Sequence, residues 1–272
     1  MSDPSDEIPK ADIAVIGGSG FYELLESVQR VEVTTPYGAP SDTVSVGAVG
    51  DRRVAFLPRH GRHHEFPPHR INYRANMWAL RSLGVEQVLA PCAVGSLRKS
   101  LGPGSVVLPD QLVDRTTGRV QTYFDHGARH VTFADPYCAA GRAAVLRAAG
   151  EAAADVHDGG VMVVVEGPRF STRAESQWYA SAGWSLINMT GHPEAVLARE
   201  LALCYTSIAL VTDYDAGVEH GEGVSQDEVF RVFAANMERL KGLVLQTVAV
   251  LDRKRECACA GAHGMDPSFE VL

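Results

Sequence analysis

Long apolar runs are missing from this sequence, since none approaches the roughly 18 residues that a membrane-spanning helix needs. The first ten residues, MSDPSDEIPK, are polar and acidic, so we expect no signal peptide and a disordered segment over residues 1–10. Basic charge is also scarce, because 25 Lys and Arg stand against 33 Asp and Glu, a net charge of −8. With no basic stripe, we expect neither nucleic acid nor a membrane as a partner.

Cysteine is sparse and odd in number, with five residues at positions 92, 138, 204, 257 and 259. This pattern is not that of a disulfide scaffold, and it fits a reducing cytoplasm. Cys257 and Cys259 follow the last expected helix in a stretch rich in glycine and alanine. We expect a flexible, exposed tail over residues 253–272, and the alternative is a redox or tail-locking role for the two cysteines.

The chain has 272 residues, 46% of them hydrophobic, which is enough for one large core. Short β-branched runs alternate with helical stretches, and most strands end in small or polar residues. The pattern predicts an α/β fold, a single domain over residues 11–252 with a mixed twisted β-sheet flanked by helices. The expected strands are 12–16, 43–46, 53–57, 85–92, 104–110, 161–165, 185–190 and 206–215, and the expected helices are 72–83, 137–154, 172–182, 193–205 and 225–251.

The run over residues 206–215 ends in two carboxylates, Asp213 and Asp215, on either side of Tyr214. Such an apolar, β-branched run is typical of a buried strand in a parallel sheet. Ligands of open α/β sheets bind beyond the carboxyl ends of the strands, so we expect both acids at the mouth of a site. The alternative is that they cap the following turn.

Two earlier segments favour anion binding. Gly17-Gly-Ser-Gly20 follows a short strand, and its amides with the Ser19 hydroxyl could cradle an anion. A dinucleotide site is the alternative, but Glu23 stands where its fingerprint needs a third glycine. Arg59 and His60 follow another strand, and arginine suits the recognition of phosphate.

Four histidines between His60 and His69 raise the alternative of a metal site. Gly61 and two prolines in this segment leave no helix to fix a pair of ligands. Few carboxylates or cysteines are near enough in sequence to complete a coordination shell. We therefore expect anion binding here and no metal site.

Taken together, the strand tips would suit a phosphate next to a heteroaromatic base. The base would stack on Phe170, and its ring N–H and amino group would donate to Asp213 and Asp215. This fit does not by itself identify a reaction.

Eight motifs in the chain resemble those of the trimeric purine nucleoside phosphorylase family, most closely its 5'-methylthioadenosine phosphorylase branch. They span about residues 12–250 in the family's order. The motifs are Gly17-Gly-Ser-Gly20, Pro58-Arg-His-Gly-Arg62, Asn72-Tyr-Arg-Ala-Asn76, Asp114-Arg-Thr-Thr117, Glu166-Gly-Pro-Arg-Phe-Ser171, Arg173-Ala-Glu175, Ile187-Asn-Met-Thr190 and Thr212-Asp-Tyr-Asp215.

The resemblance implies a nucleoside phosphorylase-like fold and a reaction in which phosphate attacks C1' of a purine nucleoside. The expected substrate is 5'-methylthioadenosine, and the products are adenine and 5-methylthioribose 1-phosphate. Inorganic phosphate is then a co-substrate, and no cofactor is expected. The resemblance also implies a cytoplasmic homotrimer of the purine salvage route, with sites near the subunit contacts.

By motif position, the resemblance assigns three groups of site residues. Asp213 and Asp215 form the catalytic pair, in which Asp213 gives or shares a proton with N7 of the leaving purine. The expected phosphate ligands are Ser19, Arg59, His60, Cys92, Ala93 and Thr190. The expected nucleoside-binding residues are His64, Phe170, Ser171, Met189, Gln226, Val229 and His130, of which His130 would line the 5' pocket of a neighbouring subunit.

Three residues bear on the exact substrate. Asp213 favours a 6-aminopurine, because a carboxylate accepts a hydrogen bond from an amino group. Cys92 replaces a hydroxyl residue usual in the family, and a thiol is a weak donor to phosphate. Gln226 replaces an apolar residue beside the 5' substituent, which could admit a 5'-hydroxyl or a 5'-halogen; its other reading is a plain first-turn helix position.

Several alternatives stay open on the sequence alone. The same phosphorolysis could act on adenosine, a 5'-halogenated deoxyadenosine or methylthioinosine. A hydrolytic nucleosidase would need no phosphate, a nicotinamide-dependent oxidoreductase would use residues 17–20, and a zinc hydrolase would use the histidines between His60 and His69.

Overall fold

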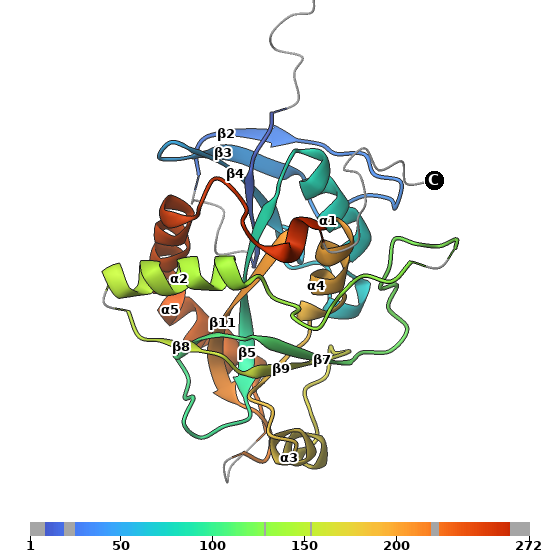
Figure 1. Ribbon diagram of the computed structural model, residues 1–272. Coiled ribbons are helices and arrows are strands. Elements are labelled where there is room, and N and C mark those ends of the chain that lie inside the picture. Colours follow the sequence, from blue (N-terminus) through green and yellow to red (C-terminus); the bar gives the residue numbers. More distant parts are fainter. Residues whose placement is uncertain (1–8, 19–24, 128, 153, 219–222, 262–272) are drawn as a thin grey trace, which may run out of the picture.

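The computed structural model describes residues 9–18, 25–127, 129–152, 154–218 and 223–261. Over these residues the chain forms a mixed sheet of 11 strands with helices on both faces, as Figure 1 shows. This arrangement confirms the predicted fold class. The strands are β1 (Ile13–Gly17), β2 (Glu26–Val31), β3 (Val44–Val49), β4 (Arg52–Pro58), β5 (Gln87–Ser96), β6 (Val106–Leu108), β7 (Gln111–Arg115), β8 (Val156–Asp158), β9 (Val161–Val165), β10 (Leu186–Asn188) and β11 (Cys204–Tyr214).

The two longest strands, β5 and β11, form the spine of the sheet. They run parallel, with residue partners from Cys204 and Gln87 to Tyr214 and Ser96. The first half of β5 also pairs with β1, and its last residues pair with β10. Strand β5 therefore joins the two halves of the sheet. It ends on the side of the sheet where the polar ends of the other strands lie.

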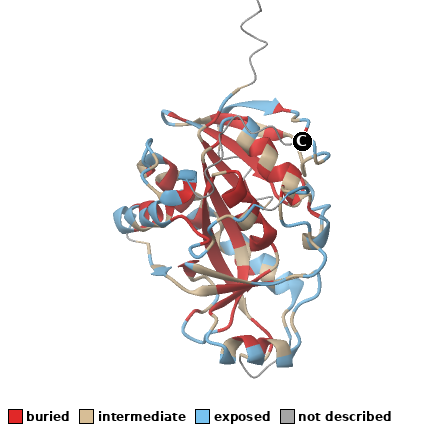
Figure 2. Cartoon of the chain, turned by 45° about the vertical axis from the view of Figure 1, so that its right-hand side comes forward, coloured by how far each residue is buried: buried red, intermediate tan, exposed pale blue. Residues whose placement is uncertain are grey.

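Side-chain alternation along the buried strands divides the core between the two faces of the sheet. In β1, Ala14 and Ile16 pack on the side of α1 and α4, while Ile13 and Val15 pack on the side of α2 and α5. This follows from the two-residue period of a strand, which sends successive side chains to opposite faces. Figure 2 shows the result, with buried strands at the centre and exposed residues on the outer surfaces.

The five predicted helices lie in the expected segments, except that the fourth ends at Glu200 rather than at Tyr205, since Cys204 and Tyr205 begin β11. They are α1 (Tyr73–Ser82), α2 (Ala139–Glu151), α3 (Arg173–Ser181), α4 (Gly191–Glu200) and α5 (Gln226–Val250), with short 3-10 turns η3 (Pro68–Arg70) and η4 (Ala258–Gly261). No helix in the described part of the chain is both long and apolar enough to cross a bilayer.

The sequence favours Ser171 as the N-cap of α3 and a capping box from Ser225 to Glu228 for α5, and both predictions are wrong. Thr172, not Ser171, caps α3, because its hydroxyl accepts the Glu175 N–H at 3.2 Å while the Glu175 carboxylate accepts the Thr172 N–H at 2.7 Å. Ser225 precedes α5 but makes no side-chain cap, and Glu228 pairs with Arg231 instead.

Three short strands were not expected from the sequence. β2, β7 and β8 carry mostly exposed or half-buried residues, so they lack the apolar pattern of a core strand. β7 pairs with β9 in a parallel register from Gln111 and Val161 onward. Tertiary pairing, rather than local composition, therefore determines these strands.

Residues 253–261, the first part of the predicted tail, are mostly exposed, but one of its two cysteines is buried. Cys259 in η4 is 4% exposed and packs against Cys138 and Cys204. Arg255 donates to the backbone carbonyl of Ala202 at 2.6 Å. Residues 262–272 lie outside the described residues, as does most of the predicted disordered segment 1–10.

Candidate active site

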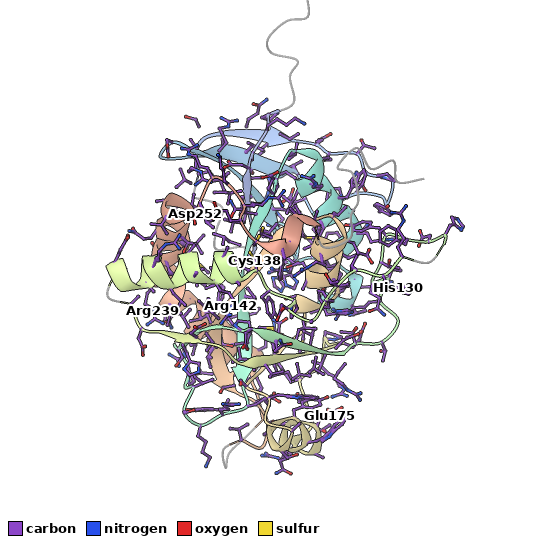
Figure 3. The ribbon with its side chains drawn as sticks, in the orientation of Figure 1. His130, Cys138, Arg142, Glu175, Arg239 and Asp252 are labelled. Carbon is purple, nitrogen blue, oxygen red and sulfur yellow. The ribbon has the colours of Figure 1, made fainter. Side chains whose placement is uncertain are left out.

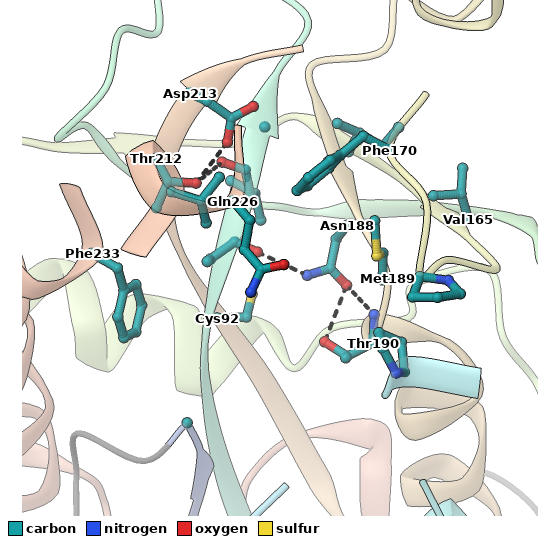
Figure 4. A pocket seen from close by; sticks show the side chains of 18 of the residues that line it. Cys92, Val165, Phe170, Asn188, Met189, Thr190, Thr212, Asp213, Gln226 and Phe233 are labelled. Carbon is teal, nitrogen blue, oxygen red and sulfur yellow. Dashed lines mark hydrogen bonds between the residues drawn. The ribbon is translucent and has the colours of Figure 1, made fainter. Parts of the chain in front are cut away.

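A cavity of about 370 Å³ opens where the ends of β1, β4, β5, β9, β10 and β11 meet, as expected for an α/β sheet. Figure 4 shows its side chains. Thirteen of the predicted site residues line it, namely Arg59, His60, His64, Cys92, Ala93, Phe170, Ser171, Met189, Thr190, Asp213, Asp215, Gln226 and Val229. Their individual roles stay predictions.

Two predicted site residues are not among those that line the cavity. Ser19 lies outside the described residues, although its neighbour Gly18 lines the cavity. His130 is exposed on the long loop between β7 and α2, and Figure 3 shows it at the outer edge of the molecule. Within one chain, His130 therefore lies away from the cavity.

A break in the β11 ladder positions Asp213. The register against β5 shifts between Val211 and Asp213, so Thr212 is the extra residue of a bulge. Bulges redirect side chains, and here the Asp213 carboxylate lies beside Gly95 on the neighbouring strand. The Thr212 hydroxyl lies 2.7 Å from Asp213 Oδ2.

Burial raises the pKa of Asp213 to about 6, although the Thr212 hydroxyl acts in the opposite direction and the Asp215 charge adds to the rise. A carboxyl group with a pKa near 6 is protonated in an appreciable fraction of molecules at neutral pH. It can therefore donate a proton to a leaving group and accept one back, which an ordinary aspartate does poorly.

Asp215 lies deeper, at 4% exposed, and burial also raises its pKa. Its Oδ2 atom and the hydroxyls of Ser171 and Ser176 are buried without a partner in hydrogen-bond geometry, although both hydroxyls are near enough to lower the pKa of the carboxyl. Unpaired buried polar atoms are costly, so this corner of the cavity is suited to a ligand with polar edges.

Phe170 lies across the cavity from Asp213 and presents an aromatic face to it (Figure 4). Its side chain is 36% exposed, which is unusual for a phenylalanine. An aromatic ring beside two carboxyls is an arrangement that binds a flat, nitrogen-rich ring.

At the opposite end of the cavity, Arg59 is held by Glu194. Its Nε and Nη2 atoms donate to the two Glu194 oxygens at 2.7 and 2.8 Å, and both side chains are buried. Arg59 also donates to the carbonyls of Ile16 and Pro91. Four of its five N–H groups are thus used, which leaves one for an anion.

His60 stacks on His64, with ring centroids 4.3 Å apart. His60 Nδ1 lies 2.9 Å from the Phe66 carbonyl oxygen, which can only accept, so Nδ1 carries the proton and Nε2 is a free acceptor. Burial, together with the Arg59 charge, lowers the pKa of His60 to about 3, although the hydrogen bond to the Phe66 carbonyl acts in the opposite direction. His60 is therefore neutral and suited to accept a hydrogen bond from a protonated oxyanion.

Asn188 organises the tip of β10. Its Oδ1 accepts the backbone N–H groups of Thr190 at 2.7 Å and Gly191 at 2.6 Å, and its Nδ2 donates to the Ala93 carbonyl at 3.1 Å. One side chain thus fixes two predicted phosphate ligands, Ala93 and Thr190, relative to each other.

The Cys92 thiol lies 3.6 Å from the Ser207 hydroxyl, and burial raises its pKa. Cys92 is therefore a neutral thiol in the wall of the cavity. The Ser207 hydroxyl on β11 therefore lies beside the position where the family usually has a serine or threonine and this chain has Cys92.

Helix α5 closes the remaining side. Gln226, Val229, Phe230 and Phe233 line the cavity from one face of its first turns. The Phe230 ring packs edge-on against His64, with centroids 6.0 Å apart. Figure 4 shows the Gln226 amide directed into the cavity.

Sequence reasoning missed four residues that form or support the site, and it assigned Asn188 no role beyond its place at a strand tip. Phe230 and Phe233 follow Gln226 and Val229 at helical spacing, a signal that was available once α5 was placed at the site. Glu194 lies within α4 and acts on Arg59 rather than on a ligand, so no local signal pointed to it. Arg119 bridges the Met189 and His192 carbonyls and the Glu166 side chain from a segment with no recognisable pattern.

The comparisons with known proteins agree with this geometry. The sequence matches the phosphorylase superfamily over residues 12–249. Purine nucleoside phosphorylase of Streptomyces coelicolor is 60% identical, over 96% of this chain and 98% of the relative. S-methyl-5'-thioadenosine phosphorylase of Mycolicibacterium smegmatis is 59% identical, over 95% of this chain and 99% of the relative.

The fold has close counterparts among solved structures. A methylthioadenosine phosphorylase from an antarctic soil metagenomic library superposes with a TM-score of 0.89 at 40% identity, covering 94% of this chain and 92% of that one. The methylthioadenosine phosphorylase of Schistosoma mansoni, solved in complex with adenine, gives a TM-score of 0.86 at 39% identity, with 90% and 93% covered.

Proposed function

Because this chain belongs to the phosphorylase superfamily, we propose that it cleaves the glycosidic bond of a purine nucleoside with inorganic phosphate. The substrate is 5'-methylthioadenosine, and the products are adenine and 5-methylthioribose 1-phosphate. Relatives that carry this activity in their names match nearly the whole chain. The observation that carries the proposal is the cavity itself, with a proton-donating carboxyl at one end and anion ligands at the other.

The cavity supports one orientation of the nucleoside. Phosphate binds at the Arg59 and Thr190 end, where the free Arg59 N–H and the Thr190 hydroxyl reach it. The purine lies between Phe170 and Asp213. The sugar spans the distance beside Met189 and His64, which places C1' between the phosphate and the base.

The reaction needs charge stabilisation at both ends of the breaking bond. When the C1'–N9 bond breaks, its electron pair moves to the purine, and the sugar develops positive charge. Asp213 donates its proton to N7 and neutralises the purine, while a phosphate oxygen approaches and bonds to C1'. A positioned general acid of this kind contributes roughly 10²–10⁴ in rate.

His60 contributes to the phosphate end through its neutral state. Its free Nε2 accepts a hydrogen bond from the hydroxyl of monoprotonated phosphate, which leaves the other oxygens to face C1'. The buried Glu194 holds Arg59 in place and balances its charge, so the phosphate dianion is not bound so tightly that it fails to react.

The base end selects a 6-aminopurine. The carboxyls of Asp213 and Asp215 accept hydrogen bonds, and the exocyclic amino group of adenine donates them. The unpaired Ser171 hydroxyl can complete the set. A 6-oxo purine would place an acceptor against acceptors, which costs binding energy.

A second candidate differs only in the 5' substituent. By its motif position the cavity residue Gln226 would lie beside the 5' substituent, and one 60% identical relative has the broader name purine nucleoside phosphorylase. Adenosine, whose 5'-hydroxyl can bond to an amide, is the substrate this observation favours.

One competition assay distinguishes these candidates. The purified protein is given 5'-methylthioadenosine, adenosine and inosine together, with phosphate and without it. We expect adenine release only with phosphate, with methylthioadenosine consumed first and inosine last. Equal release without phosphate would identify a hydrolytic nucleosidase, and preferential use of inosine would contradict the base assignment.

Three further properties belong to this proposal. The enzyme is a homotrimer, in which the exposed loop carrying His130 reaches the site of a neighbour; its mass in solution should be three times the 29.2 kDa of the chain. It works in the cytoplasm. The reaction uses phosphate as a co-substrate and no cofactor, so a metal chelator should not change the initial rate of freshly diluted enzyme.

A further inference from the structure

Four of the five cysteines, none of which lines the cavity, have their side chains gathered at one point. Cys138, Cys204, Cys257 and Cys259 have sulfur atoms that all lie within 4.8 Å of one another. Among the described residues, this is the one group of three or more His, Cys, Asp or Glu side chains arranged to hold a metal ion. The ligands come from three separate segments, so their spacing in the sequence does not indicate a metal site.

We propose that these four cysteines form a structural zinc site. Zn²⁺ binds four thiolates in a tetrahedron with Zn–S distances near 2.3 Å, which places the sulfurs about 3.8 Å apart. The Cys204 and Cys257 sulfurs are 3.2 Å apart, and no pair exceeds 4.8 Å. Shifts of about an ångström would complete the tetrahedron.

The burial of the cluster suits a closed site. Cys138 and Cys204 are each 2% exposed, Cys259 is 4% exposed, and Cys257 is half-buried. Four protein ligands leave no open coordination position for water or substrate, which is the arrangement of structural rather than catalytic zinc. Cys204 begins β11 while Asp213 lies near its end, about 30 Å away along the strand.

The fold also compensates the charge that such a site acquires. Each thiol loses its proton on binding, so a four-thiolate zinc centre carries a net charge of −2. Cys138 is the N-cap of α2, and its sulfur accepts the Gly141 N–H at 3.4 Å. The positive end of a helix dipole favours a thiolate there, and an N–H donor to sulfur is typical of the shell around zinc thiolates.

Contacts made by Asp252 and Arg255 hold the chain in place just before Cys257 and Cys259. The Asp252 carbonyl accepts from Gln87 Nε2 at 3.0 Å, and the Arg255 guanidinium bonds to Ala202 and Glu86. Cys257 directly precedes the η4 turn and Cys259 lies within it, and both sulfurs reach the same point despite the single residue between them. In Figure 1 this red segment lies beside the N-terminal end of α2, where Figure 3 marks Cys138.

A zinc ion at this site links the C-terminal segment to the start of α2 and to the start of β11. Because the unfolded chain cannot hold the four thiols together, zinc binding adds to the stability of the folded state. Zinc removal should loosen the segment after α5 and leave the cavity residues in place.

The test uses the full chain, purified in reductant and depleted of metal by a chelator. Cobalt(II) is then added anaerobically, as a coloured substitute for zinc. We expect one equivalent to bind with the absorption of a tetrahedral thiolate complex, zinc to bleach that absorption at one equivalent, and zinc to raise the melting temperature. Cys257→Ser and Cys259→Ser should lose the absorption, whereas Cys92→Ser, outside the cluster, should keep it.

Three results would overturn the proposal. The first is cobalt binding well below one equivalent, or binding that the Cys257 and Cys259 variants retain. The second is iron rather than zinc as the metal found in freshly purified protein. The third is a single free thiol in the denatured chain prepared without reductant, since two disulfides would then account for the cluster. If the variants fail to fold, the same question can be answered by thiol alkylation of the wild-type protein. We then expect zinc to slow alkylation at the four cysteines of the cluster.

Discussion

Arg59 and Glu194 form a buried ion pair joined by two parallel hydrogen bonds, at 2.7 and 2.8 Å, behind the proposed phosphate site. Tyr205 adds a hydrogen bond from its hydroxyl to Glu194 at 2.7 Å. Arg59, which the sequence assigned to phosphate binding, therefore also stabilises the fold through its ion pair with Glu194. It offers phosphate one N–H and a balanced charge, not a free guanidinium.

This pair predicts the effect of Glu194→Gln. Removing one partner of a buried pair leaves the other charge uncompensated, which costs about 3–5 kcal/mol. We expect urea unfolding to show a loss of this size in phosphate-free buffer. Added phosphate should restore part of the lost stability, because the dianion can take over the pairing with Arg59. An unchanged unfolding free energy would show that the pair does not support the fold.

The position of the Asp213 carboxylate can be tested by a substitution at Gly95, on the neighbouring strand β5. A Cβ atom at Gly95 would lie 3.0 Å from Asp213 Oδ1 and 2.9 Å from Ile187 Cγ2. Gly95→Ala should displace the carboxylate and lower kcat about 10²-fold, since misplacement by about an ångström has an effect of this order. Gly242→Ala, in open space within α5, is the matched control and should keep full activity. Equal kcat values for the two variants would contradict the proposed geometry.

The raised pKa of Asp213 predicts how stability depends on pH. Because the folded pKa, about 6, lies above that of an unfolded aspartate, the associated stability is complete below about pH 4 and is lost as the pH rises through 6. Asp213→Asn removes this dependence. Relative to wild type, the variant should gain up to about 3 kcal/mol between pH 4 and pH 7. A constant difference across that range would mean that the carboxyl is not buried in the free enzyme.

The same residue predicts a change in kinetics. With Asp213 as the acid, kcat/KM for 5'-methylthioadenosine should fall as the pH rises above about 6, and Asp213→Asn should abolish this limb. The variant should also lose activity on adenine nucleosides and gain relative activity on inosine. An unaltered pH profile in the variant would assign the acid role elsewhere.

Gln226 predicts the choice of 5' substituent. Gln226→Leu should raise the ratio of kcat/KM for methylthioadenosine over adenosine by about tenfold, because an apolar pocket discriminates by roughly 1–3 kcal/mol per group. Gln246→Leu, on the same helix but bonded to Glu151 outside the cavity, should leave the ratio unchanged. If both variants behave alike, Gln226 does not contact the 5' end.

Much of the site was predictable because strand tips carry local signals. Arg59, Asn188 and Asp213 each follow an apolar run, and the rule that strand ends gather on one side was enough to bring them together. The bulge at Thr212 could not be predicted, since it depends on the register between β11 and β5 rather than on local composition. The actual cap of α3 was missed for a related reason, as two adjacent hydroxyl residues, Ser171 and Thr172, both suit the position.

The thiol cluster shows the limit of sequence reasoning more clearly. Cys138, Cys204 and Cys259 are separated by dozens of residues, and nothing in their spacing resembles a metal motif. Only the path of the chain after α5, fixed by Asp252 and Arg255, brings them together. Contacts of this kind depend on the whole fold, and a tail rich in glycine and alanine gives no local sign of them.

The central claim is that phosphate itself is the nucleophile at C1'. Phosphorus NMR of the protein with 5'-methylthioadenosine and inorganic phosphate tests it most directly, with free adenine measured in the same sample. The account predicts one sugar 1-phosphate formed for every adenine released, and no adenine when phosphate is left out. Adenine released while the phosphate signal stays unchanged would contradict it.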